Sequence, residues 1–321
     1  MTPSVEQALV ERILQRDRHA VGRGISLIET GSPDGISLIK ALYGRAGRAF
    51  VIGVTGAPGV GKSTVVDRLI ALLRGNGHHV GVVAVDPTSP LSGGAILGDR
   101  VRMQAHVGDT GVFVRSMATR GQLGGLAIAT RDAVVVLDAA GYDIVLIETV
   151  GVGQAEVEIT RVADISAVIT IPGLGDDVQA LKAGLMEIGD IFVVNKADHT
   201  GAQQAVAEIE TMLEMQLDES KTWRPPVLLT QATTGDGIDL LLEAINQFHA
   251  ETSPLQSQRR RNRDRLGLWQ LLQQHFRREI ETGDVLRSGE FNEILESLSR
   301  RELDPYTAVE TILEHTLRKG E

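Results

Sequence analysis

The stretch from Gly56 to Ser63 has the residue types and the spacing of a phosphate-binding loop. It reads Gly56-Ala57-Pro58-Gly59-Val60-Gly61-Lys62-Ser63, fits the pattern G-x-x-x-x-G-K-[S/T], and is followed by Thr64. The glycines would let successive backbone N–H groups face one anion, and a helix that starts here would add its partial positive charge. Lys62 would supply a cation for the outer phosphates and Ser63 a hydroxyl for Mg²⁺. The pattern predicts a nucleotide site; the alternative is an ordinary glycine-rich turn between a strand and a helix.

A second motif, N-K-x-D, occupies Asn195-Lys196-Ala197-Asp198, directly after the apolar run 191–194. The carboxylate of Asp198 can accept hydrogen bonds from the N1–H and the exocyclic amine of guanine together, whereas adenine offers no such pair. A carboxylate left without donors would disfavour ATP by on the order of a few kcal/mol. Four residues alone are a weak signal, but behind a strand and far downstream of a phosphate loop they predict guanine recognition. Gln231-Ala232-Thr233 is the expected last base-contacting loop, although it departs from the Ser-Ala-Lys-like sequence usual there.

Carboxylates that could hold Mg²⁺ lie between these two motifs. The apolar run 142–147 ends in Glu148, where a carboxylate of phosphate-loop enzymes meets the Mg²⁺ shell. Glu148-Thr149-Val150-Gly151 is similar to the second switch of GTPases, with Glu where Asp is usual and Gly151 placed to reach a γ-phosphate through its N–H. Asp86 and Asp99 could complete the metal site or position water, or they could merely cap a strand and a helix. The predicted catalytic residues are Lys62, Asp99, Glu148 and Gly151, and the predicted metal ligands are Ser63, Asp86, Asp99 and Glu148.

The group that orients water in many GTPases is missing from its usual place. Val152 follows Gly151 where Ras-like enzymes have Gln, and Gln154 cannot be assumed to substitute for it. We therefore expect slow intrinsic hydrolysis, with an activating group brought by a partner or a moving loop. The polar, glycine-rich segment 172–177 could be such a mobile loop, or a plain loop between a strand and a helix.

Strands and helices must alternate to bring these residues together. Apolar runs at 49–55, 80–85, 111–115, 142–147, 167–171, 191–194 and 227–229 predict strands, and stretches such as 64–74 and 124–140 predict helices between them. This order predicts an α/β fold with a mostly parallel central sheet covered on both faces, and with ligands at the carboxyl ends of the strands. We expect a helical extension at 1–48, the nucleotide domain at 49–250 and a helical C-terminal region at 251–321.

Composition excludes several classes of function. The chain has 321 residues, 42% of them hydrophobic and 23% charged, a net charge of −10 and no cysteine. Disulfides and thiolate chemistry are therefore excluded, and nucleic-acid or anionic-membrane binding is unfavourable. No apolar run approaches a membrane span, and acidic residues within 1–20 argue against a targeting peptide, so a cytoplasmic location is the simplest. The arginines of 259–265 could form a nucleic-acid patch, but the net negative charge of the chain favours the start of a helix that is solvated or faces an interface.

Longer motifs resemble one family. Segments 85–90, 93–100, 148–154 and 173–184, which read VDPTSP, GGAILGDR, ETVGVGQ and GLGDDVQALKAG, are similar to those of the MeaB/ArgK family. These are P-loop GTPases of the SIMIBI-like type that act as chaperones of adenosylcobalamin-dependent methylmalonyl-CoA mutase. The resemblance covers nearly the whole chain; Ala155 departs from it, where Ser is expected in many relatives.

The resemblance implies several properties. It implies a homodimer joined partly through the C-terminal helices, with Mg²⁺ held beside bound GTP or GDP near Ser63, Asp86, Asp99 and Glu148. It implies a third switch around 175–182 that couples the nucleotide state to the mutase and gates delivery of intact cofactor. The residues of switch and partner coupling would be Gln154, Asp176, Asp177 and Lys182. Three alternatives remain open. The first is a nickel-insertion maturation GTPase, which the lack of cysteine disfavours, and the second is an ATP-using kinase of a transport system, which the N-K-x-D motif disfavours. The third is a nucleotide-binding scaffold without turnover, because no water-orienting group is evident.

Overall fold

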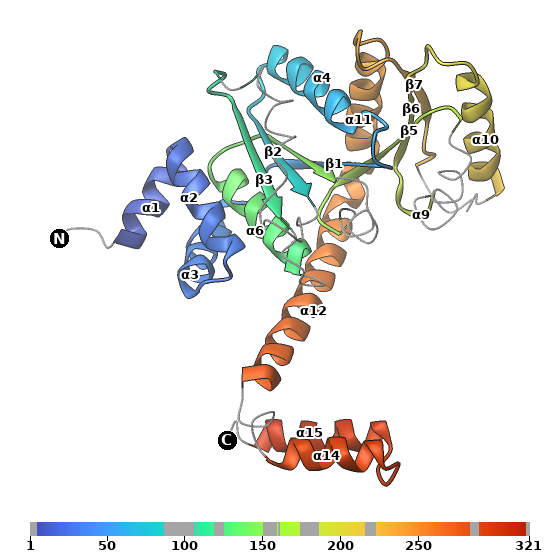
Figure 1. Cartoon of the computed structure of the whole chain (residues 1–321). Coiled ribbons are helices and arrows are strands. Elements are labelled where there is room, and N and C mark those ends of the chain that lie inside the picture. The colour runs from blue at the N-terminus through green and yellow to red at the C-terminus, as the bar shows by residue number, and fades with distance from the viewer. Residues whose placement is uncertain are drawn as a thin grey trace. The chain divides into compact units, whose positions relative to one another are not determined.

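The structure is a computed structural model that describes residues 5–86, 106, 108–118, 125–149, 159, 161–173, 186–215, 223–282 and 289–318, with backbone only at some of them, Asp86 among these. Its centre is a seven-stranded, fully parallel sheet in the order β3-β2-β4-β1-β5-β6-β7 (Figure 1). The strands are β1 (Phe50–Thr55), β2 (Val80–Asp86), β3 (Val112–Ala118), β4 (Ile144–Thr149), β5 (Ile165–Thr170), β6 (Ile191–Asn195) and β7 (Val227–Thr230). The predicted α/β fold with a parallel sheet is confirmed.

Helices cover both faces of the sheet. The N-terminal helices are α1 (Val5–Leu14), α2 (Arg18–Glu29) and α3 (Pro33–Leu42), followed by a 3-10 turn, η1 (Tyr43–Arg45). Between the strands lie α4 (Lys62–Gly75), α6 (Gly125–Ala139), the short α9 (Met186–Ile188) and α10 (Ala202–Met215). After β7 come α11 (Ile238–Thr252), the 3-10 turn η4 (Ser253–Leu255), α12 (Gln256–Thr282), α14 (Gly289–Ser299) and α15 (Pro305–Arg318). None of these described helices is long and apolar enough to cross a membrane.

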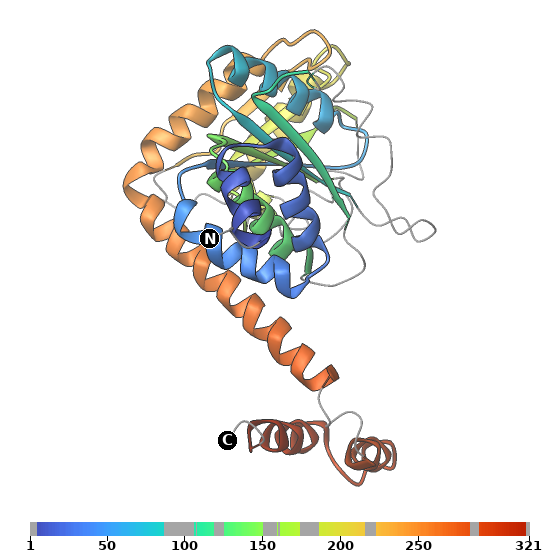
Figure 2. The same cartoon turned by 90° about the vertical axis from the view of Figure 1, so that its left-hand side faces the viewer.

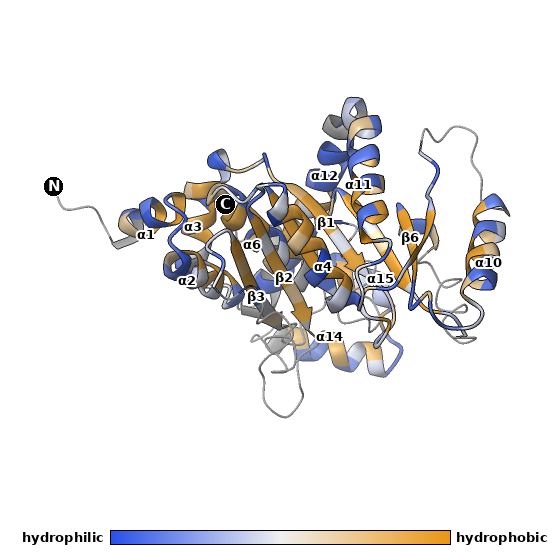
Figure 3. Ribbon diagram, turned by 90° about the horizontal axis from the view of Figure 1, so that it is seen from above, coloured by the Kyte–Doolittle hydropathy of each residue, from blue (hydrophilic) through white to orange (hydrophobic). Residues whose placement is uncertain are grey.

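Alternate residues of each central strand enter different hydrophobic cores. Val51 of β1 and Val145 of β4 pack with α6 and the N-terminal helices, whereas Ile52 and Leu146 pack with α4 and α11. This follows from the period of two in a strand, because successive side chains point to opposite faces. Strands buried on both faces read as nearly continuous apolar runs, which is why they are visible in the sequence and largely orange in Figure 3.

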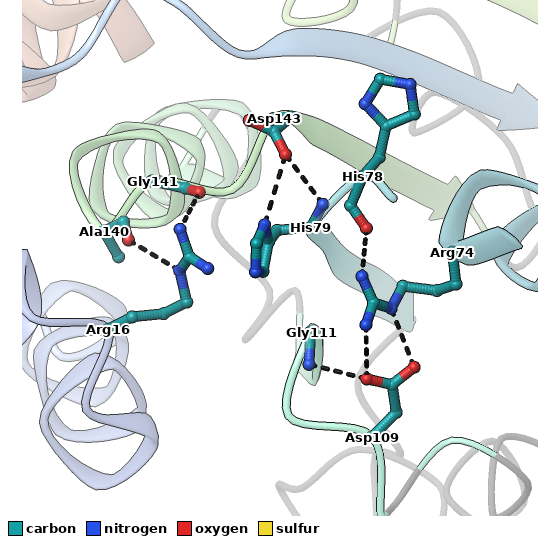
Figure 4. Close-up of polar contacts among 9 residues, drawn as sticks. All are labelled: Arg16, Arg74, His78, His79, Asp109, Gly111, Ala140, Gly141 and Asp143. Atoms are coloured by element: carbon teal, nitrogen blue, oxygen red, sulfur yellow. Dashed lines mark hydrogen bonds and ion pairs between the residues drawn. The ribbon is translucent and has the colours of Figure 1, made fainter. Parts of the chain in front are cut away.

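The amino edge of the sheet carries a repeated device. An aspartate stands directly before each of β4, β5 and β6. Its carboxylate accepts a hydrogen bond from a backbone N–H of the neighbouring strand or of the residue just before that strand. Asp143 accepts from His79 at 2.8 Å (Figure 4), Asp164 from Val51 at 2.8 Å, and Asp190 from Ser166 at 2.9 Å. These carboxylates satisfy donors that would otherwise lie unpaired at the end of the ladder.

The N-terminal helices pack on α6 and belong to the same compact unit as the sheet, which runs from Met1 to Asp264. Figure 2 shows these helices in front of α6. Gly24 of α2 permits the approach of its neighbours, since an added Cβ would lie 3.0 Å from a methyl group of Ile13. Arg16 donates to the carbonyls of Ala140 (3.2 Å) and Gly141 (2.6 Å), just past the end of α6 (Figure 4). A cation at a helix C-terminus is favoured by the helix dipole.

The first part of α12 belongs to this unit and binds the amino edge of the sheet. Arg263 forms an ion pair with Asp164, and Arg259 lies 3.5 Å from the carboxylate of Asp190 and over the ring of Phe248. The interpretation of the arginine run as an interface-facing helix start is therefore correct for Arg259 and Arg263. The second unit, Arg265–Glu321, contains the rest of α12 and the pair α14 and α15.

Candidate nucleotide-binding site

The loop between β1 and α4 is shaped by three glycines with positive φ: Gly56 (139°), Gly59 (79°) and Gly61 (99°). A Cβ on Gly56 would lie 2.0 Å from the carbonyl oxygen of Ile169, and a Cβ on Gly61 would lie 2.4 Å from Nδ2 of Asn195. Both positions combine a left-handed backbone with a close neighbour, so only glycine fits them. The predicted sequence of strand, glycine loop and helix is present.

Lys62 and Ser63 are the first two residues of α4, and both are buried. The ammonium of Lys62 donates to the carbonyls of Gly56 and Ala57, each at 2.7 Å, and so ties the start of the loop to the start of the helix. A buried ammonium needs such partners, because an unpaired charge inside a protein is costly. The result is a cation held directly at the mouth of the glycine loop.

Glu148 joins this group from the neighbouring strand. It is the penultimate residue of β4, it is buried, and its Oε1 accepts a hydrogen bond of 2.5 Å from the hydroxyl of Ser63. One residue on, the hydroxyl of Thr149 donates to that of Thr55 at 3.0 Å and links the ends of β4 and β1. Asp86 ends β2, on the other side of β4, one position past the pair Val85 and Thr149. Hydroxyl and carboxylate oxygens at adjoining strand ends are the donor set that Mg²⁺ prefers.

The N-K-x-D motif lies at the end of β6, and its three functional residues differ in surroundings. Asn195 is 2% exposed and acts as a clamp: its Nδ2 donates to the carbonyl of Val60 at 2.8 Å. Its Oδ1 accepts from the hydroxyl of Thr230 and from the N–H of Ala232, each at 3.1 Å. Asn195 therefore joins the phosphate loop, β7 and the loop after β7.

Lys196 and Asp198 lie nearer the surface than Asn195. Lys196 has a positive φ of 57° and its ammonium donates to the carbonyl of Gly59 at 3.2 Å. Asp198 is exposed. The first two residues of the motif thus hold the phosphate loop, and the carboxylate expected to accept from guanine faces outward.

The third loop, Gln231–Thr233, follows β7. It is closed by a backbone bridge in which the N–H of Gln231 donates to the backbone carbonyl of Asp236 at 2.9 Å. Its other anchor is a residue that the motifs did not reveal. Arg68 of α4 donates to the carbonyl of Ala232 at 3.1 Å and to that of Thr233 at 2.5 Å. Nothing in the sequence marks Arg68, because it is a single cation on the outer side of a helix.

Several predicted residues lie outside the described part of the chain. They include Asp99 among the metal ligands and Gly151 in the second switch; the coupling residues Gln154, Asp176, Asp177 and Lys182 lie there as well. Among the residues that the structure describes, no group of three or more His, Cys, Asp or Glu could hold a metal ion. The structure does bring together Lys62, Ser63, Glu148 and Asn195 at the carboxyl edge of the sheet. The backbone of Asp86, the last residue of β2, lies at the same edge.

A phosphate loop, a carboxylate at the end of the adjacent strand and an N-K-x-D loop on one parallel sheet define a P-loop GTPase. Residues 21–284 match the family described as "Methylmalonyl Co-A mutase-associated GTPase MeaB". The chain belongs to this family.

Its relatives agree with this placement. A protein of Pyrococcus abyssi named as a GTPase is 46% identical over 316 residues, 97% of each chain. The GTPase ArgK of Escherichia coli is 38% identical over 246 residues, 74% of each chain. A mouse protein named methylmalonic aciduria type A homolog, mitochondrial, is 34% identical over 74% of this chain and 59% of its own. A crystal structure titled as a LAO/AO transport system kinase superposes with a TM-score of 0.74 at 27% identity and covers 98% of both chains.

Proposed function

We propose that this GTPase converts GTP and water to GDP and phosphate slowly and serves as a chaperone of an adenosylcobalamin-dependent acyl-CoA mutase, in the first place methylmalonyl-CoA mutase. In this proposal the nucleotide state gates delivery of intact cofactor to the mutase and protects or reactivates it. The observation that carries the GTPase part is the contact of Ser63 with Glu148 beside the tethered Lys62. The family description supports the choice of partner.

At the phosphate end, Lys62 would leave the carbonyls of Gly56 and Ala57 to pair with the outer phosphates. Ser63 and Glu148 would hold Mg²⁺, with Asp86 and Asp99 as the further ligands. When bound, Mg²⁺ neutralises charge that develops on the phosphate oxygens. The hydrogen bond between Ser63 and Glu148 supports this assignment, since it already brings two hard oxygen donors together inside the protein. Gly151 would donate its N–H to the γ-phosphate.

At the base end, Asp198 would accept the two donors of guanine, and the loop Gln231–Thr233 would flank the ring. The exposure of Asp198, next to the buried Asn195, supports this assignment. The same two loops argue against an ATP-using transport kinase, because adenine does not offer the pair of hydrogen-bond donors that the carboxylate of Asp198 would need.

The second unit supports the homodimer in the proposal. Its described helices expose large apolar side chains: Leu268 (58%), Trp269 (61%) and Leu272 (51%) on α12, with further ones at Leu266, Leu271, Leu295, Tyr306 and Val309. Such a surface on a soluble protein is typical of an interface. We assign a second copy of the chain as the occupant, and the switch residues Gln154, Asp176, Asp177 and Lys182 as the contact with the mutase.

The test is GTP turnover with Mg²⁺, measured for the protein alone and with a purified adenosylcobalamin-dependent mutase. We expect slow turnover of GTP, acceleration by the mutase, and loss of turnover at low GTP in Asp198→Ala. The control is Asp239→Ala, which removes a different carboxylate, in the first turn of α11, and should keep wild-type turnover. GTP hydrolysis that no acyl-CoA mutase changes would remove the partner from the proposal. ATP turnover equal to that of GTP would overturn the assignment of Asp198.

A further inference from the structure

Arg68 lies on α4, one helical turn after Thr64, and its guanidinium spans two consecutive carbonyls of the loop after β7. We propose that Arg68 is a positioning residue for guanine binding, because it fixes the loop Gln231–Thr233 relative to the phosphate loop. This inference rests on the proposed base site and names a residue that controls it. Arg68 itself would touch neither the base nor the phosphates.

The loop is held from two sides. The N–H of Ala232 donates to Asn195, and the carbonyls of Ala232 and Thr233 accept from Arg68. The side chain of Ala232 is 2% exposed and packs in the same core as Val65 of α4. Without Arg68, the loop would keep its anchor to β6 through Asn195 and lose its polar anchor to α4.

The helix that carries Arg68 is a rigid connection to the phosphates. The side chains of Val65, Val66 and Leu69, around Arg68, are fully buried in the core below α4. The same helix begins with Lys62 and Ser63. Arg68 therefore connects the loop after β7 to the helix that begins at the phosphate loop.

The chemistry of the contact requires arginine. The planar guanidinium presents Nε and Nη2 side by side, which suits two carbonyls that follow each other in the chain. A lysine at this position could donate to either carbonyl but does not match both with a fixed geometry. The contribution to nucleotide binding should therefore fall in the order arginine, lysine, alanine.

Three variants test the inference: Arg68→Ala, Arg68→Lys and the matched control Arg74→Ala. Arg74 lies on the same helix, but it binds the carboxylate of Asp109 at 2.8 and 2.9 Å, at the far end of α4 from the phosphate loop (Figure 4). The readouts are the dissociation rate of a fluorescent GDP analogue, the KM and kcat for GTP, and the inhibition constant of inorganic tripolyphosphate, which occupies the phosphate end without a base. Melting temperatures are measured in parallel.

We expect Arg68→Ala to raise the GDP dissociation rate and the KM for GTP about tenfold, the effect of losing hydrogen bonds from a charged donor. The kcat and the tripolyphosphate constant should stay within about twofold of wild type, because the loss acts on the base end alone. Arg68→Lys should fall between wild type and Arg68→Ala. Arg74→Ala should lower the melting temperature and leave the GDP dissociation rate unchanged.

Two results would overturn the inference. One is a wild-type GDP dissociation rate in a folded Arg68→Ala. The other is an equal loss of tripolyphosphate and GTP binding, which would mean that Arg68 supports the whole site. If Arg68→Ala does not fold, the same two criteria apply to Arg68→Lys. The underlying base site is tested separately by Asp198→Ala: unchanged GTP binding there would refute the site itself, whatever Arg68 does.

Discussion

The hydroxyl of Ser63 and Oε1 of Glu148 lie 2.5 Å apart, although the two residues are 85 positions apart in the chain. One begins α4 and the other nearly ends β4, and both are buried. Because β4 lies next to β1 in the sheet and runs parallel to it, the carboxyl end of β4 lies beside the loop that follows β1. The assignment of Ser63 and Glu148 as magnesium ligands depends on this proximity of their side-chain oxygens.

Glu148→Gln tests that assignment with little change of shape. The amide can still accept from Ser63, but it removes the negative charge, and we expect the Mg²⁺ requirement to rise and GTP turnover to fall about 10- to 100-fold. The measurement is turnover against Mg²⁺ concentration, with complete loss on chelation in the wild type. Asp143→Asn, at the other end of β4, is the matched control and should retain wild-type turnover. An unchanged Mg²⁺ dependence in Glu148→Gln would contradict the role given to this carboxylate.

Asn195→Asp tests the clamp between the phosphate loop and the base loops. Aspartate keeps the acceptor for Thr230 and Ala232, but it loses the donor to Val60 and turns an oxygen toward that carbonyl. We expect a loss of about 1–3 kcal/mol in the free energy of unfolding, as for a buried carbonyl left unpaired, together with weaker GDP binding. Urea unfolding and a GDP titration measure the two effects.

Thr230→Val is the comparison for Asn195→Asp. It removes the hydroxyl that donates to Oδ1 of Asn195 and leaves the donor to the phosphate loop in place. The expected cost is about 1 kcal/mol, with nearly wild-type GDP binding. Equal effects of the two variants on GDP would show that the contact with Val60 does not shape the phosphate loop.

The ion pair between Arg263 and Asp164 gives a prediction about stability. The side chain of Arg263 is 17% exposed and that of Asp164 is 8% exposed, and Asp164 also accepts from the N–H of Val51. Arg263→Ala would leave a largely buried carboxylate without its cation, so we expect the free energy of unfolding to fall by about 3 kcal/mol. Arg261→Ala, an exposed arginine on the same helix, should change it by less than about 0.5 kcal/mol. Similar results for both variants, measured by urea unfolding, would mean that α12 is not anchored through Arg263.

Sequence reasoning could place the sheet and the phosphate loop because their signals are local. Strands buried on both faces must be apolar throughout, and Gly56 and Gly61 occupy backbone conformations that other residues rarely adopt. The limits of strands carry a weaker signal: the strand predicted at 111–115 is β3, which runs from Val112 to Ala118.

The contacts that sequence reasoning missed join distant segments. Arg68 and Ala232 are 164 positions apart, and nothing in either neighbourhood marks the pairing. The arginine run of 259–265 allowed two interpretations until the partners Asp164 and Asp190 were known. Those aspartates precede β5 and β6, so the choice depended on which edge of the sheet α12 meets, and only tertiary structure decides that.

Asp132 of α6 provides a prediction about pH. Burial raises the pKa of its carboxyl to about 6 from an ordinary value of 3.8, and the nearby Arg131 offsets only part of the shift. Because the folded state holds this proton more tightly than the unfolded state, the contribution of Asp132 to stability is greatest below about pH 4 and is lost as the pH rises toward 6. At neutral pH the ionised carboxylate destabilises the fold.

Asp132→Asn should therefore raise the free energy of unfolding at pH 7.5 by about 1–2 kcal/mol and change it little at pH 4. Asp109→Asn should behave in the opposite way, because its hydrogen bonds with Arg74 lower the pKa of Asp109 to about 2. The stability that Asp109 contributes is present above about pH 4 and is lost as the pH falls toward 2, so its variant should be less stable than wild type at neutral pH. Urea unfolding of both variants between pH 2 and 8 measures the two slopes, that of Asp109 between about pH 2 and 4 and that of Asp132 between about pH 4 and 6. A stability gain for Asp132→Asn that does not change over this range would mean that the substitution acts through packing, and that ionisation of Asp132 is not the cause.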